Sequence, residues 1–197
     1  MFSNKNYKVP EQFENIFKIV SSPRFLNKEG LGGEIPFFIH SFPIEKQPEV
    51  YANIQSLLKR MTNNNIDVLE VNLYKLAIDI LKKEEIFEQI INQEEKLPKQ
   101  RLLRVISSPL NIDAIVVPEI HRRLLDKPSK MIFLTGIDTV FPIIRSHTIL
   151  NNLQTLVGDI PLVMFFPGTY NNQSLTLFNK LKDDNYYRAH NLNGYKV

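Results

Sequence analysis

The segment MIFLTGIDTVFPIIRSHTILNNLQ (Met131–Gln154), followed by IPLVMFFPGTY (Ile160–Tyr170), predicts the architecture of this chain. Each segment contains an apolar run of about five residues, which is typical of a strand covered on both faces. Between the two runs, Asp138 or Thr139 can cap a helix whose first turn would contain Pro142. Strand, helix and strand in this order predict a βαβ unit, and therefore a sheet that is at least partly parallel.

Two loops of these segments mark the expected place of a functional site. Ligands and partners of open α/β sheets bind outside the carboxyl ends of the strands. Thr135–Asp138 and Pro167–Tyr170 would both lie at such ends. The pattern predicts where a site lies, but it names no reaction.

Apolar patterns elsewhere predict the remaining elements. Two further strands are expected, at Ile35–Phe42 and Asp67–Tyr74. Apolar residues at helical spacing predict helices at Glu11–Val20 and Pro48–Asn63. Similar spacing in the tail predicts a docking helix, whose apolar residues are Leu175, Leu177, Phe178 and Leu181.

Helical patterns also fill residues 83–127, between the second and third strands. The helix that follows the second strand is expected to break near Lys83. Further helices are expected at Pro98–Ser107 and Asn111–Leu125, with Pro118 bending the latter or moving its start. Because this block is longer than one crossover needs, we expect a helical insertion or a partner-binding face.

Together these elements predict one α/β domain over residues 1–197, with an open, mostly parallel sheet of about four or more strands flanked by helices. This fold class is Rossmann-like or P-loop-like, but a phosphate loop is missing. The glycine-rich segment Arg24–Gly33 precedes a strand and lacks both G-x-x-x-x-G-K-[ST] and G-x-G-x-x-G. No cofactor is therefore expected.

Composition restricts the class of protein. The apolar fraction of 43% suffices for a sizeable core, and the net charge of +3 is mostly interspersed rather than gathered in a stripe. The absence of cysteine excludes disulfides, thiolate catalysis and cysteine-based zinc sites. The first residues contain no apolar signal region, and no apolar run approaches the length of a membrane span. We expect a cytoplasmic protein that does not contact the membrane.

Catalytic and metal-binding patterns are missing as well. The four histidines form no metal-ligand spacing with each other or with carboxylates. Ser146 and His147 are adjacent, so on a helix they point about 100° apart and cannot act as nucleophile and base. His40 is expected to be a hydrogen-bonded core residue. The chain is therefore predicted to be neither an enzyme nor a metalloprotein.

Two groups of polar residues remain as candidates. Glu70 and Asn72 share one face of the second strand, where a carboxylate is either functional or solvated at a half-covered edge. The second group gathers polar and aromatic residues at strand ends and on the helix after the third strand. It is a candidate partner interface, although its tyrosines could equally cap the core, and it comprises Arg145, His147, Asn151, Asn152, Tyr170, Tyr187 and Arg188.

Four segments carry a resemblance to a known family. They are SSPRFLNKEGLGGEIPFFI (21–39), VLEVNLYKLAIDILK (68–82), FLTGIDTVFPIIRSHTILNNLQ (133–154) and PLVMFFPGTYNNQSLTLFNKLKDDNYYRAHNL (161–192). On them the chain resembles BrxB, a small subunit encoded in bacteriophage-exclusion (BREX) defence clusters. The resemblance spans about Phe13–Leu192, and the block 83–127 carries little of it.

The resemblance implies a component of a system that blocks phage DNA replication and accompanies methylation of host DNA. Its neighbours there are a large ATPase (BrxC), an adenine methyltransferase (PglX) and a phosphatase-like protein (PglZ). It implies an assembly or regulatory subunit that contacts PglZ and BrxC and reaches DNA indirectly through the complex. The family supplies no catalytic residues to carry over.

Two other functions stay open. The doubly wound pattern also suits a degenerate, ATPase-like nucleotide-binding domain without hydrolysis, because Met131–Asp138 stands where such proteins often carry an acidic strand end. Mild basicity and the BREX setting also suit a DNA-binding accessory subunit, whose affinity would fall steeply with salt.

Overall fold

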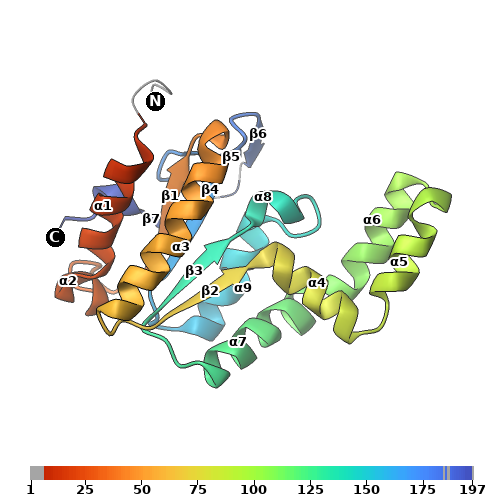
Figure 1. Ribbon diagram of the computed structural model, residues 1–197, viewed down its shortest axis with the longest axis horizontal. Coiled ribbons are helices and arrows are strands. Elements are labelled where there is room, and N and C mark those ends of the chain that lie inside the picture. Colours follow the sequence, from red (N-terminus) through yellow and green to blue (C-terminus); the bar gives the residue numbers. More distant parts are fainter. Residues whose placement is uncertain (1–6, 184, 186, 197) are drawn as a thin grey trace. The chain divides into compact units, whose positions relative to one another are not determined.

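The computed structural model describes residues 7–183, 185 and 187–196 of the chain. The chain divides into two compact units (Figure 1). Unit 1 consists of Met1–Glu70, Pro128–Leu134 and Asp159–Val197, and unit 2 consists of Val71–Lys127 and Thr135–Gly158. The block predicted at 83–127 falls within unit 2. Whether the chain folds as one domain stays a prediction.

The described residues form a seven-stranded sheet, most of which belongs to unit 1. The strand order is β2-β3-β4-β1-β7, and β5 and β6 extend it as a side branch from β4. The bounds are β1 (Phe37–Phe42), β2 (Val68–Asn72), β3 (Met131–Thr135), β4 (Leu162–Tyr170), β5 (Leu175–Leu177), β6 (Leu181–Asp183) and β7 (His190–Asn191).

Strand β4 is the centre of the sheet. It runs parallel to β1, with Phe37 opposite Leu162, and parallel to β3, with Ile132 opposite the same Leu162. Strand β7 is also parallel to β1. Every residue of β1 and β3 is buried, and for β3 the continuous apolar run Met131–Leu134 predicted this. The predicted fold class, an open and mostly parallel α/β sheet, is confirmed.

Two helices cover one face of this sheet in unit 1. They are α1 (Val9–Val20) and α3 (Gln47–Asn63), and they lie side by side in Figure 1. Each buries one apolar stripe, such as Phe13 and Ile16 of α1, against strand residues such as Phe165. Three shorter segments complete unit 1: α2 (Pro23–Leu26), η2 (Ile44–Lys46) and η6 (Leu192–Gly194).

The predicted docking helix in the tail is wrong, because β5 and β6 form a hairpin there. Leu175 and Leu177 are buried while Thr176 between them is half-buried, which is the alternation of a strand. Phe178 and Asn179 have φ of 56° and 57°, a left-handed pair that suits a tight hairpin turn and ends a helix.

The predicted loop Pro167–Tyr170 is also wrong, because β4 continues through it. Pro167 is the last residue opposite β1, and Gly168 is the first opposite β5. The strand therefore changes partner at this dipeptide instead of ending. Gly168 has φ of 151°, and a Cβ atom there would lie 2.1 Å from the carbonyl oxygen of Thr176, so only glycine allows this approach.

Unit 2 is helical. Its elements are α4 (Leu73–Lys83), α5 (Phe87–Gln93), η3 (Glu94–Lys96), α6 (Lys99–Ser107), η4 (Ser108–Leu110), a π-helical turn η5 (Ile112–Val116), α7 (Val117–Asp126), α8 (Ile137–Val140) and α9 (Ser146–Val157). The predicted break near Lys83 is confirmed. Asn111 caps the segment that follows it, since its Oδ1 accepts from the Ala114 amide at 2.8 Å. Pro118 lies in the first turn of α7, where a missing N–H is tolerated.

The helix predicted to begin at Asp138 or Thr139 begins instead at Ser146. Asp138 and Thr139 belong to the four-residue helix α8, which ends before Phe141. Phe141 has φ of −65° and ψ of 137°, the extended conformation that a following proline favours. Pro142 therefore separates α8 from α9 rather than opening one long helix.

Candidate functional site

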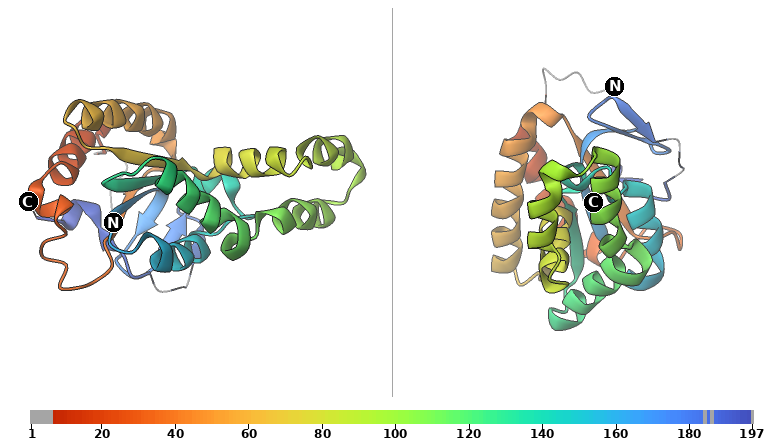
Figure 2. Two further views of the ribbon diagram at one scale, coloured as in Figure 1. Left: turned by 90° about the horizontal axis from the view of Figure 1, so that it is seen from below. Right: turned by 90° about the vertical axis from the view of Figure 1, so that its right-hand side faces the viewer.

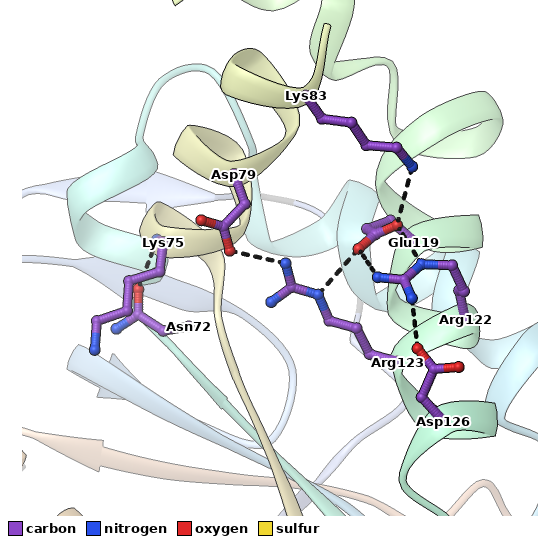
Figure 3. Close-up of polar contacts among 8 residues, drawn as sticks. All are labelled: Asn72, Lys75, Asp79, Lys83, Glu119, Arg122, Arg123 and Asp126. Atoms are coloured by element: carbon purple, nitrogen blue, oxygen red, sulfur yellow. Dashed lines mark hydrogen bonds and ion pairs between the residues drawn. The ribbon is translucent and has the colours of Figure 1, made fainter.

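Asn72 and Gly136 meet in unit 2 at the carboxyl ends of β2 and β3. Oδ1 of Asn72 accepts from the Lys75 amide at 3.1 Å and so caps α4, and Figure 3 shows this pair. Gly136 has φ of +73°, and a Cβ atom added to it would lie 2.8 Å from the same Oδ1. Asn72, a predicted buried polar residue, is half-buried here and orders the helix start.

Glu70, the other predicted buried polar residue, lies on β2 in unit 1. Its side chain is half-buried, and its Oε2 accepts from Nε2 of Gln55 at 3.0 Å. Strand β2 stands at one end of the sheet order, so this carboxylate lies on an edge strand. An edge position reduces the desolvation cost that a carboxylate inside a central strand would carry.

A network of ion pairs links α4 and α7 in unit 2 (Figure 3). Its centre is Glu119, whose side chain is only 12% exposed. Arg122 donates to both carboxylate oxygens, at 2.8 and 2.9 Å, and Nε of Arg123 donates at 3.2 Å. Nζ of Lys83 lies 3.9 Å away. The hydrogen bond from Arg122 is the main cause that lowers the pKa of Glu119 to about 2.

Acids and bases alternate through the rest of this network. Arg123 Nη2 reaches Asp79 of α4 at 2.9 Å, and Arg122 also pairs with Asp126. The carboxylate of Glu119 raises the pKa of Arg122 further. A carboxyl group held ionised in this way cannot serve as a general acid near neutral pH. We therefore interpret the network as a structural link between α4 and α7. Sequence analysis missed it, although Glu119, Arg122 and Arg123 stand at i, i+3 and i+4 spacing.

His40 occupies the core of unit 1, as the sequence predicted. The residue is fully buried, and its Nε2 lies 2.7 Å from the hydroxyl oxygen of Tyr7. Burial is the main cause that lowers the pKa of His40 to about 4, and the Asn193 side chain acts in the opposite direction. Among the described residues, His40 Nδ1 and Asn193 Oδ1 are both buried without a hydrogen-bond partner.

Four residues of the predicted interface lie in unit 2. Arg145 is exposed and lies directly before α9, at its N-cap position. His147 is half-buried and Asn151 is exposed. Asn152 is half-buried and donates to the Thr148 carbonyl at 2.8 Å.

The other three residues lie in unit 1. Tyr170 and Tyr187 are 7% and 3% exposed, so neither ring lies open on the surface. The Tyr170 hydroxyl donates to the Ala189 carbonyl at 2.7 Å, and that of Tyr187 donates to Asp183 at 2.5 Å. Both rings therefore hold the C-terminal segment, whereas Arg188 is exposed. The interface as one surface stays a prediction.

An apolar groove opens in unit 2 among α5, α6 and η4. It has a volume of about 630 Å³, and its apolar lining comes from Ile86, Ile90, Val105 and Pro109. Figures 1 and 2 show α5 and α6 lying side by side. The sequence predicted a possible partner-binding face within 83–127, but it did not identify this groove.

Helix α6 covers its apolar residues only in part, since Leu102 and Ile106 are half-buried. This fully described helix contains no buried residue. Leu103 and Val105 are each 37% exposed, and Ile91 of α5 is 49% exposed. An amphipathic helix is ordinarily stabilised by burying its apolar stripe, so a pair of helices with open stripes marks an interaction surface.

The described part of the chain contains neither a cluster of metal ligands nor a membrane-spanning helix. No three histidine, cysteine or acidic side chains gather there as a metal would require. None of the described helices is long and apolar enough to cross a membrane.

Comparison with known proteins gives one family and two relatives. The family model described as "BREX protein BrxB" matches residues 69–192. A BREX protein BrxB of Bacillus cereus (strain H3081.97) is 37% identical over 189 residues, covering 94% of this chain and 97% of the relative. A BREX protein BrxB of Escherichia coli O9:H4 (strain HS) is 30% identical over 173 residues, covering 88% of this chain and 86% of the relative. No solved structure matches this chain.

Proposed function

This chain belongs to the BrxB family of BREX proteins, and from that premise we propose that it is a non-enzymatic subunit that assembles with other proteins of its BREX cluster. Assembly would serve defence against phage, in the cytoplasm. The partners proposed are a PglZ-like protein and a BrxC-like ATPase, and any contact with DNA would be made through the complex.

The observation that carries this proposal is the uncovered apolar surface of unit 2. Val105 of α6 is 37% exposed and lines a groove of about 630 Å³, and Ile91 of α5 and Leu103 of α6 are further exposed apolar residues on the same two helices. Burial of apolar surface supplies about 25 cal/mol per Å², so covering such a patch favours association. Patches of this kind on otherwise polar helices are typical of protein–protein contacts.

Tagged co-purification followed by size-exclusion chromatography tests the proposal. The chain is expressed with the PglZ-like and BrxC-like proteins of its own cluster, first singly and then together. We expect co-elution with at least one of them at an earlier volume than the free chain. Elution of the chain alone in every combination would contradict an assembly role.

A nucleotide-binding role is the second candidate, and the sheet topology supports it. Strands β1 and β4 are parallel neighbours in unit 1, and the sites of open α/β sheets lie beyond the carboxyl ends of such strands. The segment after β1, Pro43–Lys46, is a tight turn without glycine. Gly168 follows the last residue of β4 that pairs with β1. It is already packed against Thr176. Both observations oppose a phosphate cradle there.

Thermal unfolding with and without Mg-ATP distinguishes the two roles. Ligand bound to the folded state raises the unfolding midpoint, by several degrees at saturation. We expect no shift for an assembly subunit. A shift of that size would favour nucleotide binding.

A further inference from the structure

We propose that the groove among α5, α6 and η4 binds an acidic amphipathic helix of another protein. The inference rests on the proposed function and specifies which surface of this chain makes the contact and what chemistry it recognises. The occupant lays an apolar stripe into the groove and places a carboxylate beside Arg104.

The shape and polarity of the groove favour a helix. Two helices side by side form a trough into which a third can pack with ridges in grooves. The apolar lining residues Ile86, Ile90 and Val105 offer the contacts, while Gln89 and Gln93 make one wall polar but uncharged. A helix with one apolar stripe and a polar remainder matches this combination.

The charge of the groove selects an acidic occupant. Arg104 is the one charged residue among the described residues that line it. Helix α6 also carries Lys99 and Arg101 and contains no acidic residue. The acidic residues of α5 and η3, which are Glu88, Glu94 and Glu95, do not line the groove. In the described part of the chain, none of these three side chains forms an ion pair, so their charges are available to a partner.

A second copy of this chain that docks its own α6 fits the groove poorly. Packing α6 of one copy on α6 of another would bring the same three cations together, and like charges at an interface disfavour association. A partner of opposite charge gains both apolar burial and charge complementarity.

Photo-cross-linking in the assembled complex tests this inference. Benzoylphenylalanine replaces Val105 in the groove in one variant and Leu125 of α7 in the control variant. Leu125 is 66% exposed and does not line the groove. The chain is expressed with the rest of its BREX cluster, irradiated and purified, and mass spectrometry identifies the cross-linked peptides. We expect position 105, but not 125, to cross-link to one segment of another BREX protein with helical apolar spacing and net negative charge.

A synthetic peptide of the cross-linked segment then gives the affinity. Anisotropy titrations compare the wild type with Val105→Glu and Arg104→Glu, and with Leu125→Glu as the control. We expect the two groove variants to weaken binding at least about tenfold, and the control less than about twofold. Unfolding curves establish that each variant is folded.

Several outcomes would overturn the inference. They are a cross-link from position 105 to a second copy, to lipid or to a neutral or basic segment, and equal cross-linking from both positions. A complex that co-purifies intact with both groove variants also overturns it, yet leaves the assembly function standing. If no BREX protein co-purifies with the wild type, the proposed function fails and the inference falls with it.

Discussion

The hydroxyl oxygen of Tyr7 lies 2.7 Å from Nε2 of His40 in the core of unit 1. This contact joins Tyr7, two residues before the start of α1, to the middle of β1, and the two residues are 33 positions apart in the chain. Both side chains are buried, and burial raises the pKa of Tyr7 and lowers that of His40, so the hydrogen bond joins two neutral groups. A buried polar pair of this kind stabilises the fold only while both partners are present.

Tyr7→Phe should therefore destabilise the protein. The change leaves Nε2 of His40 buried without its partner, which costs about 1–3 kcal/mol of unfolding free energy. Urea denaturation measures the loss. Tyr74→Phe is the control, because Tyr74 is 50% exposed and should change stability by less than about 0.5 kcal/mol. Equal effects of the two changes would contradict this role of the pair.

Acid should weaken the fold through His40. Its pKa falls from the ordinary value of 6.5 to about 4 in the folded chain. Between these pH values the unfolded chain binds a proton that the folded chain excludes, so the unfolding free energy decreases as pH falls through this window. The loss should approach about 3 kcal/mol near pH 4. Urea denaturation at a series of pH values measures it.

His40→Gln provides the comparison for that pH series. The variant should lose this part of the pH dependence, although its stability at neutral pH is lower. His121→Gln, a change on α7, should keep it. A pH profile unchanged by the removal of His40 would show that another group governs the window.

Gly136→Ala should destabilise the chain more than the same substitution at a glycine that also has a positive φ but has free space around its Cβ position. The new Cβ would stand 2.8 Å from Oδ1 of Asn72, in addition to the cost of a positive φ, which is about 1 kcal/mol. Gly32→Ala is the control, since its φ is +60° and nothing lies within 4 Å of its Cβ position. In an Asn72→Ala background the excess cost at position 136 should shrink, and thermal unfolding of the four variants measures this coupling.

Glu119→Gln should weaken the contact between α4 and α7. The carboxylate accepts from Arg122 and Arg123, and its removal should cost about 1–3 kcal/mol near neutral pH. Because the folded pKa is lowered from 4.5 to about 2, this stabilisation is present above pH 4.5 and is lost as pH falls toward 2. Chemical denaturation at pH 7 measures the cost, with the exposed Glu88→Gln as control. No difference between the two would mean that solvent screens the network.

Arg145→Ala and Asn151→Ala should reduce co-purification with the partner if the predicted interface extends over the start of α9. Both side chains are exposed, so the changes should leave the fold intact. Thr155→Ala, at an exposed position later in α9, is the control. Pull-down yield under matched expression measures the effect. Unchanged yield and unchanged defence would remove these residues from the interface.

The strands of the core could be predicted from the sequence because both of their faces are buried. Phe37–Phe42 is apolar apart from His40 and Ser41, and Met131–Leu134 is continuously apolar. Runs as short as these are typical of buried strands rather than of helices. The family was predicted from longer motifs, and the relatives confirm it.

The tail shows where pattern alone fails. Leu175 and Leu177 suit the strand period, while Phe178 and Leu181 stand at helical spacing, so the pattern suits both structures. Pairing with Gly168–Tyr170 of β4 selects the strand, and the apolar spacing of the tail does not reveal that pairing. Tyr170 and Tyr187 were ambiguous in the same way, because an aromatic residue looks identical in sequence whether it caps a core or anchors an interface.

By itself, the sequence determined the fold class, the main helices and the family, since these depend on residue order and on local apolar periodicity. Tertiary structure alone decided which apolar surface stays open. The stripes of α1 and α6 look alike as patterns, yet Ile16 of α1 is fully buried and Val105 of α6 is not. The physical reason is that apolar periodicity shows which side chains are stabilised by burial, whereas the packing of the rest of the chain determines which of them are buried.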